Sequence, residues 1–138
     1  MDSLVTFVKL LLFLETILLT PEPIHIGNNW ISITPEHPIK AITGGAAIYI
    51  DVTKYIAPFD WDTSSEHFQE GVVQGRLIKL DGSEITLANS GTSHDNDFVW
   101  LIVDSEAPLP TNVEFVHIKL RSTKPIESAL VYWKNGKH

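Results

Sequence analysis

Hydrophobic and polar residues alternate in short runs along most of the chain from residue 21 onward. In the clearest run, Ile48, Ile50 and Val52 occupy every second position, and more polar residues lie between them. A period of two places successive side chains on opposite faces of an extended segment. The run therefore predicts a β-strand with one buried face.

Several other runs of this kind predict strands, and turn residues separate them. The strongest signal is a hairpin in which residues 76–80 and 84–87 flank a turn at Gly82, because glycine supplies the positive φ that tight turns need. Residues 98–103 are apolar on both phases, which predicts a central strand that is covered on both faces. The other predictions are strands at residues 24–26, 30–33, 116–121 and 129–133, inward positions for Val116, Ile118 and Leu120, and core positions for Trp30, Trp100 and Trp133.

The pattern as a whole predicts a mainly β protein. Residues 21–138 are expected to form a single antiparallel β-sandwich, immunoglobulin-like or jelly-roll-like, preceded by one N-terminal hydrophobic helix. The chain has no cysteine, which excludes the disulfide-bonded core of an antibody domain, thiolate metal sites and cysteine nucleophiles. The order of the strands does not follow from the pattern.

Residues 1–20 are predicted as a separate N-terminal helix. Residues 4–19 are apolar apart from two threonines, Lys9 and Glu15, and as a helix they measure about 25 Å, the short limit for crossing the hydrocarbon core of a bilayer. They predict a single-pass membrane anchor, a signal-anchor in contact with lipid. An ionisable group in lipid needs an exit to water or a polar partner, so Lys9 is expected at the interface, and Glu15 near the other end of the helix or against a partner helix.

Two alternatives to the anchor stay open. A cleaved signal peptide needs small residues before the cut, whereas Leu18 and Thr20 occupy those positions here. A soluble helix buried in a groove is the other alternative. No Lys or Arg occurs between Leu10 and Ile39, so the excess of positive charge expected in the cytoplasm places residues 21–138 on the extracytoplasmic side, periplasmic or extracellular.

The charge of the chain bears on its partners. The formal net charge of −7 at pH 7 argues against a nucleic-acid partner, because phosphate binding needs clustered Lys and Arg. Residues 51–106 contain eleven acidic and three basic residues, whereas residues 107–138 contain two acidic and five basic residues. No phosphate-binding loop or EF-hand spacing occurs, so the sequence predicts no cofactor.

An aromatic and acidic group forms the candidate ligand-binding site. Phe59, Asp60, Trp61 and Asp62 lie in a long irregular connection. Exposed tryptophan contacts proteins or stacks on sugars, so the group predicts a ligand site with carbohydrate as the ligand class. The alternative is that these aromatic rings fold inward and close one end of the sandwich.

A polar loop offers a candidate metal site. His94, Asp95 and Asp97 provide imidazole and carboxylate ligands, which suit Ca²⁺ or a transition metal; residues 60–67 offer a similar set. Ser93, His94 and Asp95 do not predict a catalytic triad, because consecutive loop residues point their side chains apart. The alternative for this loop is a polar turn.

The leading functional prediction is a membrane-tethered, non-enzymatic interaction or accessory module with a protein partner, such as a small subunit of a larger membrane assembly. It rests on the apolar N-terminal segment and on the lack of a catalytic constellation. The alternatives are a carbohydrate-binding β-sandwich that uses residues 59–68, and a metal-dependent hydrolase. The sequence leaves enzymatic activity open and favours its absence.

Overall fold

The computed structural model describes residues 16–42, 45–52, 68–92, 98–103 and 108–135. Within them the chain forms strands and no helix, and every pairing is antiparallel. The predicted mainly β, antiparallel class is therefore confirmed. The strands are β1 Thr16–Leu18, β2 Ile24–Ile26, β3 Ile31–Ile33, β4 Ile39–Lys40, β5 Ala47–Asp51, β6 Val73–Lys79, β7 Glu84–Thr92, β8 Phe98–Val103, β9 Glu114–Ser122 and β10 Ile126–Lys134.

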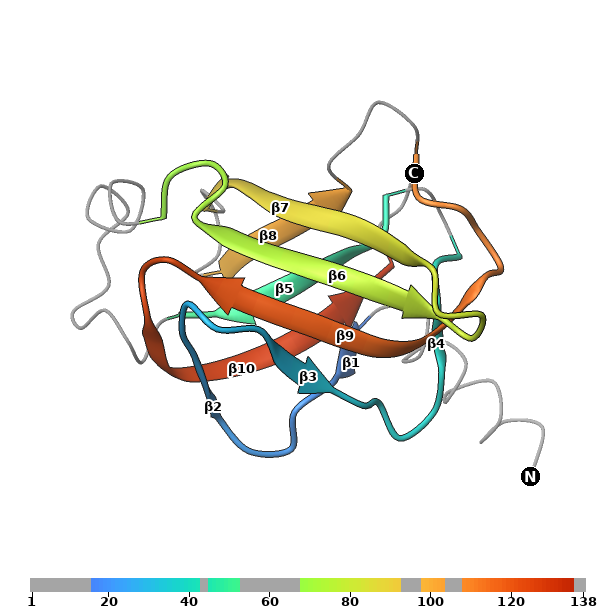
Figure 1. Ribbon diagram of the computed structural model, residues 1–138, viewed down its shortest axis with the longest axis horizontal. Helices are drawn as coiled ribbons and strands as arrows, with labels where there is room; N and C mark the ends of the chain where they lie inside the picture. Colours follow the sequence, from blue (N-terminus) through green and yellow to red (C-terminus); the bar gives the residue numbers. More distant parts are fainter. Residues whose placement is uncertain (1–15, 43–44, 53–67, 93–97, 104–107, 136–138) are drawn as a thin grey trace, which may run out of the picture.

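The strands follow one another in the order β1-β10-β5-β8-β7-β6-β9-β3, with β2 also beside β10 and β4 also beside β9. Figure 1 shows two layers: β7, β6, β9 and β3 lie in front of β8, β5 and β10. We call them the front layer and the back layer, and β1 belongs to the back layer because it pairs with β10. The arrangement fits a sandwich or barrel-like fold.

The core lies between the layers and follows from the period-two pattern. On β5, Ile48 and Ile50 have no exposed surface, and the same holds for Val131 and Trp133 on the adjacent β10. Phe68 is likewise fully buried. Burying a large apolar side chain contributes about 1.5–3 kcal/mol, so these positions account for much of the stability of the fold.

The predicted hairpin is confirmed between β6 and β7. Gly82 has a φ of 87°, a conformation that side chains with a Cβ avoid. The Asp81 carboxylate accepts hydrogen bonds from the Ser83 hydroxyl and, at 2.9 Å, from the Ser83 amide. These bonds, first the one from the hydroxyl, lower the pKa of Asp81 below its ordinary value.

The structure corrects the prediction for residues 98–103. β8 does lie between β5 and β7, as a central strand should, but it is not covered on both faces. Leu101 is fully buried, whereas Ile102 keeps 40% of its surface exposed. Trp100 and Trp30 are half-buried and lie outside the core, so of the three tryptophans predicted there only Trp133 is confirmed.

A bulge in β9 changes which residue faces the core. Ile78 pairs with His117, and the next residue of β6 pairs with Phe115, so that Val116 has no partner between them. Phe115 is fully buried and its ring centroid lies 6.3 Å from that of Trp133, whereas Val116 is only half-buried. The inward position predicted for Val116 is therefore wrong. An extra residue in one strand shifts the alternation by one position.

The helix predicted over residues 1–20 does not include its last five residues. Thr16–Leu18 is the strand β1. Leu19 and Thr20 are buried beside Val131, whose carbonyl accepts from the Leu19 amide at 2.8 Å and whose amide donates to the Thr20 hydroxyl at 3.0 Å. Residues 1–15 lie outside the described residues. Across the ranges that the structure describes, no helix has the length and hydropathy to span a membrane.

Candidate functional site

All site residues predicted from the sequence lie outside the described residues: Phe59, Asp60, Trp61 and Asp62 of the ligand site, His94, Asp95 and Asp97 of the metal site, and Lys9 and Glu15 of the anchor. They stay predictions. Among the side chains that the structure does describe, no group of three or more His, Cys, Asp or Glu is placed to hold a metal ion.

The outer face of the back layer carries a row of large amphipathic and apolar side chains. Leu18 pairs with Tyr132, Tyr132 with Tyr49, and Tyr49 with Trp100. Residues directly opposite one another in a sheet point to the same face. The four side chains therefore form one continuous line across β1, β10, β5 and β8, which we call the aromatic row.

Burial confirms that the aromatic row faces outward. The residues that alternate with it, such as Ile48, Leu101 and Trp133, have no exposed surface because they face the core. Leu18, at one end of the row, keeps 48% of its surface exposed. Ile102 extends the apolar surface beyond Trp100 on β8.

Two rings of the aromatic row, those of Tyr49 and Trp100, contact each other. The centroids of Tyr49 and Trp100 are 4.9 Å apart with the rings tilted by 35°, an arrangement that aromatic pairs favour. Burial raises the pKa of the Tyr49 phenol, so this ring is uncharged at neutral pH. The Lys134 ammonium nitrogen lies 5.5 Å from the Tyr49 centroid and is the cation nearest this ring in the described residues.

The aromatic row could not be found from the sequence. Its members lie on four strands that are distant along the chain, and only the strand order and the register bring them together. The single usable signal was the presence of Tyr49, Trp100 and Tyr132 within predicted strands, and of these Trp100 was expected in the core.

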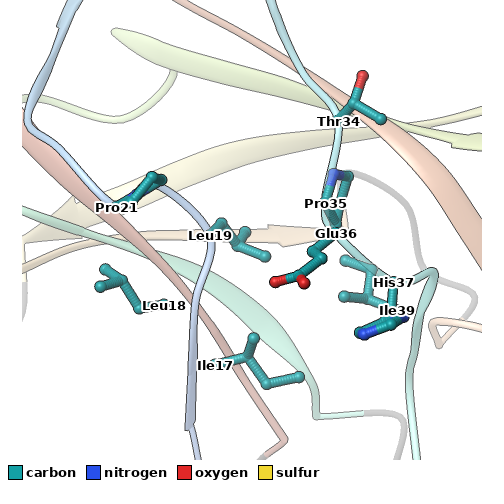
Figure 2. Close-up of a pocket in the computed structure, with 9 residues that line it drawn as sticks. All are labelled: Ile17, Leu18, Leu19, Pro21, Thr34, Pro35, Glu36, His37 and Ile39. Carbon is teal, nitrogen blue, oxygen red and sulfur yellow. The ribbon is translucent and has the colours of Figure 1, made fainter.

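A pocket of about 450 Å³ lies beside β1. Figure 2 shows it between the segment that carries Leu19 and the segment that carries Glu36 and His37. Pockets of this size bind small molecules when buried polar groups orient the ligand. Glu36 and His37, the ionisable side chains of the lining, are exposed, so they do not provide such buried groups. The lining residues are Ile17, Leu18, Leu19, Pro21, Thr34, Pro35, Glu36, His37 and Ile39.

Comparison with known proteins adds no relative to this picture. No protein-family model matches the chain, and neither the curated proteins nor the solved structures contain a significant match. The surfaces of the molecule are therefore the guide to its function, because function depends on the sites that a fold carries and not on the fold itself.

Proposed function

We propose that the chain is a non-enzymatic interaction module that docks onto a protein partner through the aromatic row, as an accessory subunit of a larger assembly at a membrane. The observation that carries the proposal is the continuous line of Leu18, Tyr132, Tyr49 and Trp100 on the outer face of the back layer. Tyrosine and tryptophan are enriched where interfaces gain most of their binding energy.

The dimensions and charge of this face suit a protein contact. Four adjacent strands at about 4.8 Å spacing give a row roughly 15 Å wide, enough to seat one strand or helix of a partner. No charged residue stands within the row, and Lys134 and Asp51 lie at its two flanks. The centre of a protein interface is likewise depleted of charge, and its rim is polar.

The finer fold class is also part of the proposal. If β1 with β2 and β3 with β4 are each counted as one strand, the back layer runs first, eighth, third and sixth, and the front layer runs second, seventh, fourth and fifth. This order is that of two Greek keys wound into an eight-stranded jelly roll. Pairing of the first strand with the last supports the jelly roll over the immunoglobulin-like alternative.

The membrane part of the proposal rests on the apolar residues before β1. Because Thr16–Leu18 belongs to the sheet, the apolar run available to a helix shortens from residues 4–19 to residues 4–15. A helix of that length measures about 18 Å, less than the roughly 30 Å of hydrocarbon. We therefore favour attachment in the membrane interface, or against a partner helix, with the β domain on the extracytoplasmic side.

Charge placed in the aromatic row at Leu18, or on the apolar surface that extends the row at Ile102, is expected to abolish partner binding. Leu18→Lys and Ile102→Lys alter side chains that are already 48% and 40% exposed, so both variants should fold. In mild detergent, light scattering should find the unaltered protein in an assembly heavier than its own 15.4 kDa, and both variants as free chains. The expected change in affinity is at least about tenfold, because a buried unpaired charge is costly.

Leu80→Lys is the matched control. Leu80 is 82% exposed at the β6–β7 turn, away from the aromatic row, and should tolerate lysine without losing the partner. A strictly monomeric unaltered protein, or equal behaviour of all three variants, would contradict the proposal. The same three variants on a glycan panel test whether the row binds a sugar instead of a protein: sugar binding that only Leu80→Lys retains assigns the row to a sugar, whereas sugar binding by all three leaves residues 59–68 as the carbohydrate site.

The membrane attachment has its own expected outcome. After cell fractionation the full-length protein should sediment with membranes, and an alkaline carbonate wash should release it if it lies in the interface and retain it if it spans the bilayer. A reporter fused after His138 should be active only on the extracytoplasmic side. Full-length protein in the soluble fraction before any wash would contradict membrane attachment.

A further inference from the structure

Both arginines of the chain, Arg76 and Arg121, stack on the same tryptophan. Their guanidinium carbons lie 4.4 Å and 4.5 Å from the centroid of the Trp30 ring. The register brings these groups together, since Arg121 pairs with Gln74 across β9 and β6, and Trp30 directly precedes the strand that pairs with β9 on its other side. We call this group the Trp30 cluster, and its members are Trp30, Gln74, Arg76, Glu84, Lys119 and Arg121.

The Trp30 cluster has a surplus of positive charge. Arg76, Lys119 and Arg121 are cations, and Glu84 is the one carboxylate that contacts them among the described residues, 3.4 Å from Arg76 and 4.0 Å from Lys119. The formal surplus is therefore two positive charges, in a chain whose net charge is −7. Like charges gathered around one ring and one carboxylate raise the energy of the unliganded site unless an anion balances them.

Arg121 is held in place but is not neutralised. Its Nε donates to the Gln74 side-chain oxygen at 2.7 Å, and its guanidinium stacks on Trp30. Within the described residues it has no carboxylate partner, and its two terminal nitrogens make no hydrogen bond. These nitrogens present donors in the fixed fork that matches phosphate and carboxylate oxygens.

We propose that the Trp30 cluster binds a tetrahedral oxyanion, the phosphate or sulfate group of a ligand, held by Arg121 and Arg76 with Lys119 beside them. Two unbalanced positive charges match the nearly dianionic charge of a phosphate monoester or of sulfate. The stack on Trp30 and the bond to Gln74 fix both the ring and one guanidinium in advance, so less side-chain freedom is lost on binding. The site lies on the front layer, whereas the aromatic row lies on the back layer, so the two can bind independently.

Nuclear magnetic resonance reads this site directly. Because the chain has two arginines, its spectrum contains two arginine Nε–H signals, and both come from the Trp30 cluster. Titration with inorganic phosphate at constant ionic strength should shift both signals along a saturating curve, and sodium chloride should not. Linear shifts of the same size in both salts would overturn the proposal.

Substitutions distinguish specific phosphate binding at the Trp30 cluster from non-specific electrostatic attraction of anions. Arg121→Lys keeps the charge but loses the fork, and should weaken phosphate binding about tenfold or more. Lys119→Gln removes one cation and should weaken it also; Lys134→Gln removes an equal charge on β10 and should leave it unchanged. The backbone spectrum of each variant reports whether the fold is intact, and equal loss in Lys119→Gln and Lys134→Gln would overturn the proposal.

Vesicles distinguish the two sources of such a group. If the ligand is a lipid headgroup, vesicles that contain phosphatidic acid, whose phosphate is a monoester, should bind the protein, phosphatidylcholine vesicles should not, and Arg121→Lys should reduce the binding. If phosphate saturates the site and neither vesicle binds, the ligand is soluble. If neither phosphate, nor sulfate, nor either kind of vesicle binds, the oxyanion site is excluded. That result would not bear on the proposal for the aromatic row.

Discussion

Trp133→Ala is expected to lower the free energy of unfolding by about 3–5 kcal/mol, the loss typical of a large buried aromatic side chain. Trp133 has no exposed surface, packs against Phe115 and donates from its indole nitrogen to the Lys40 carbonyl at 3.3 Å. Truncation leaves a cavity between the layers and removes the hydrogen bond to the segment around β4. Since domains are stable by about 5–15 kcal/mol, this variant is expected to be partly unfolded at physiological temperature.

A urea titration monitored by circular dichroism measures this loss of unfolding free energy. Trp133→Phe keeps most of the volume and should lose less than the alanine variant. Trp100→Ala is the matched control, because Trp100 is only half-buried and lies on the outer face of the sheet. If Trp133→Ala cost no more than Trp100→Ala, the position of Trp133 at the centre of the core would be wrong.

Asn89→Ala is expected to cost about 2–4 kcal/mol, because it leaves buried backbone groups without partners. Asn89 is 1% exposed on β7. Its side-chain oxygen accepts from the Val73 amide at 2.9 Å, and its side-chain nitrogen donates to the carbonyls of Phe68 and Gln69, each at 3.1 Å. One side chain thus connects β7 to the first residue of β6 and to the backbone of the fully buried Phe68.

Hydrogen exchange tests this role at a single atom. In Asn89→Ala the Val73 amide should exchange much faster than global unfolding of the variant allows. The amides in the middle of β10 should still exchange only as fast as global unfolding allows. Asn28→Ala, in an exposed turn, is the control and should change neither stability nor exchange. A Val73 amide that stays equally protected in Asn89→Ala would contradict the assignment.

Local patterns predicted local structure well. The alternation around Ile48 and Ile50 and the glycine of the β6–β7 turn each depend on neighbouring residues, so both appear in the sequence as they do in the structure. The prediction for Val116 failed because a bulge inserts one residue and shifts the pattern, and period-two alternation carries no sign of it.

The candidate surfaces depend on register, which the sequence does not reveal. Trp30 was expected in the core because it belongs to a strand pattern. The pattern does not show whether aliphatic groups or guanidinium groups cover the tryptophan ring. In the structure Arg76 and Arg121 cover it, and their positions opposite it follow from strand pairings between distant segments.

The N-terminal segment shows the same limit. Thr16, Ile17 and Leu18 suit the end of an apolar helix and an edge strand equally, since β-branched and aliphatic residues are common in strands. What decides for the strand is β10, its partner at the far end of the described chain. No window of neighbouring residues contains that information.

The pairing of β1 with β10 also has a consequence for biosynthesis. A ribosome delivers Thr16 long before Lys134, the residue that pairs with it, so β1 waits until β10 has been synthesised before it can join the sheet. Folds whose contacts join distant segments close slowly, because the entropy of a long loop must be lost first. During translation the apolar Leu18 and Leu19 therefore remain open to chaperones, and the fold is completed only after the last strand has left the ribosome.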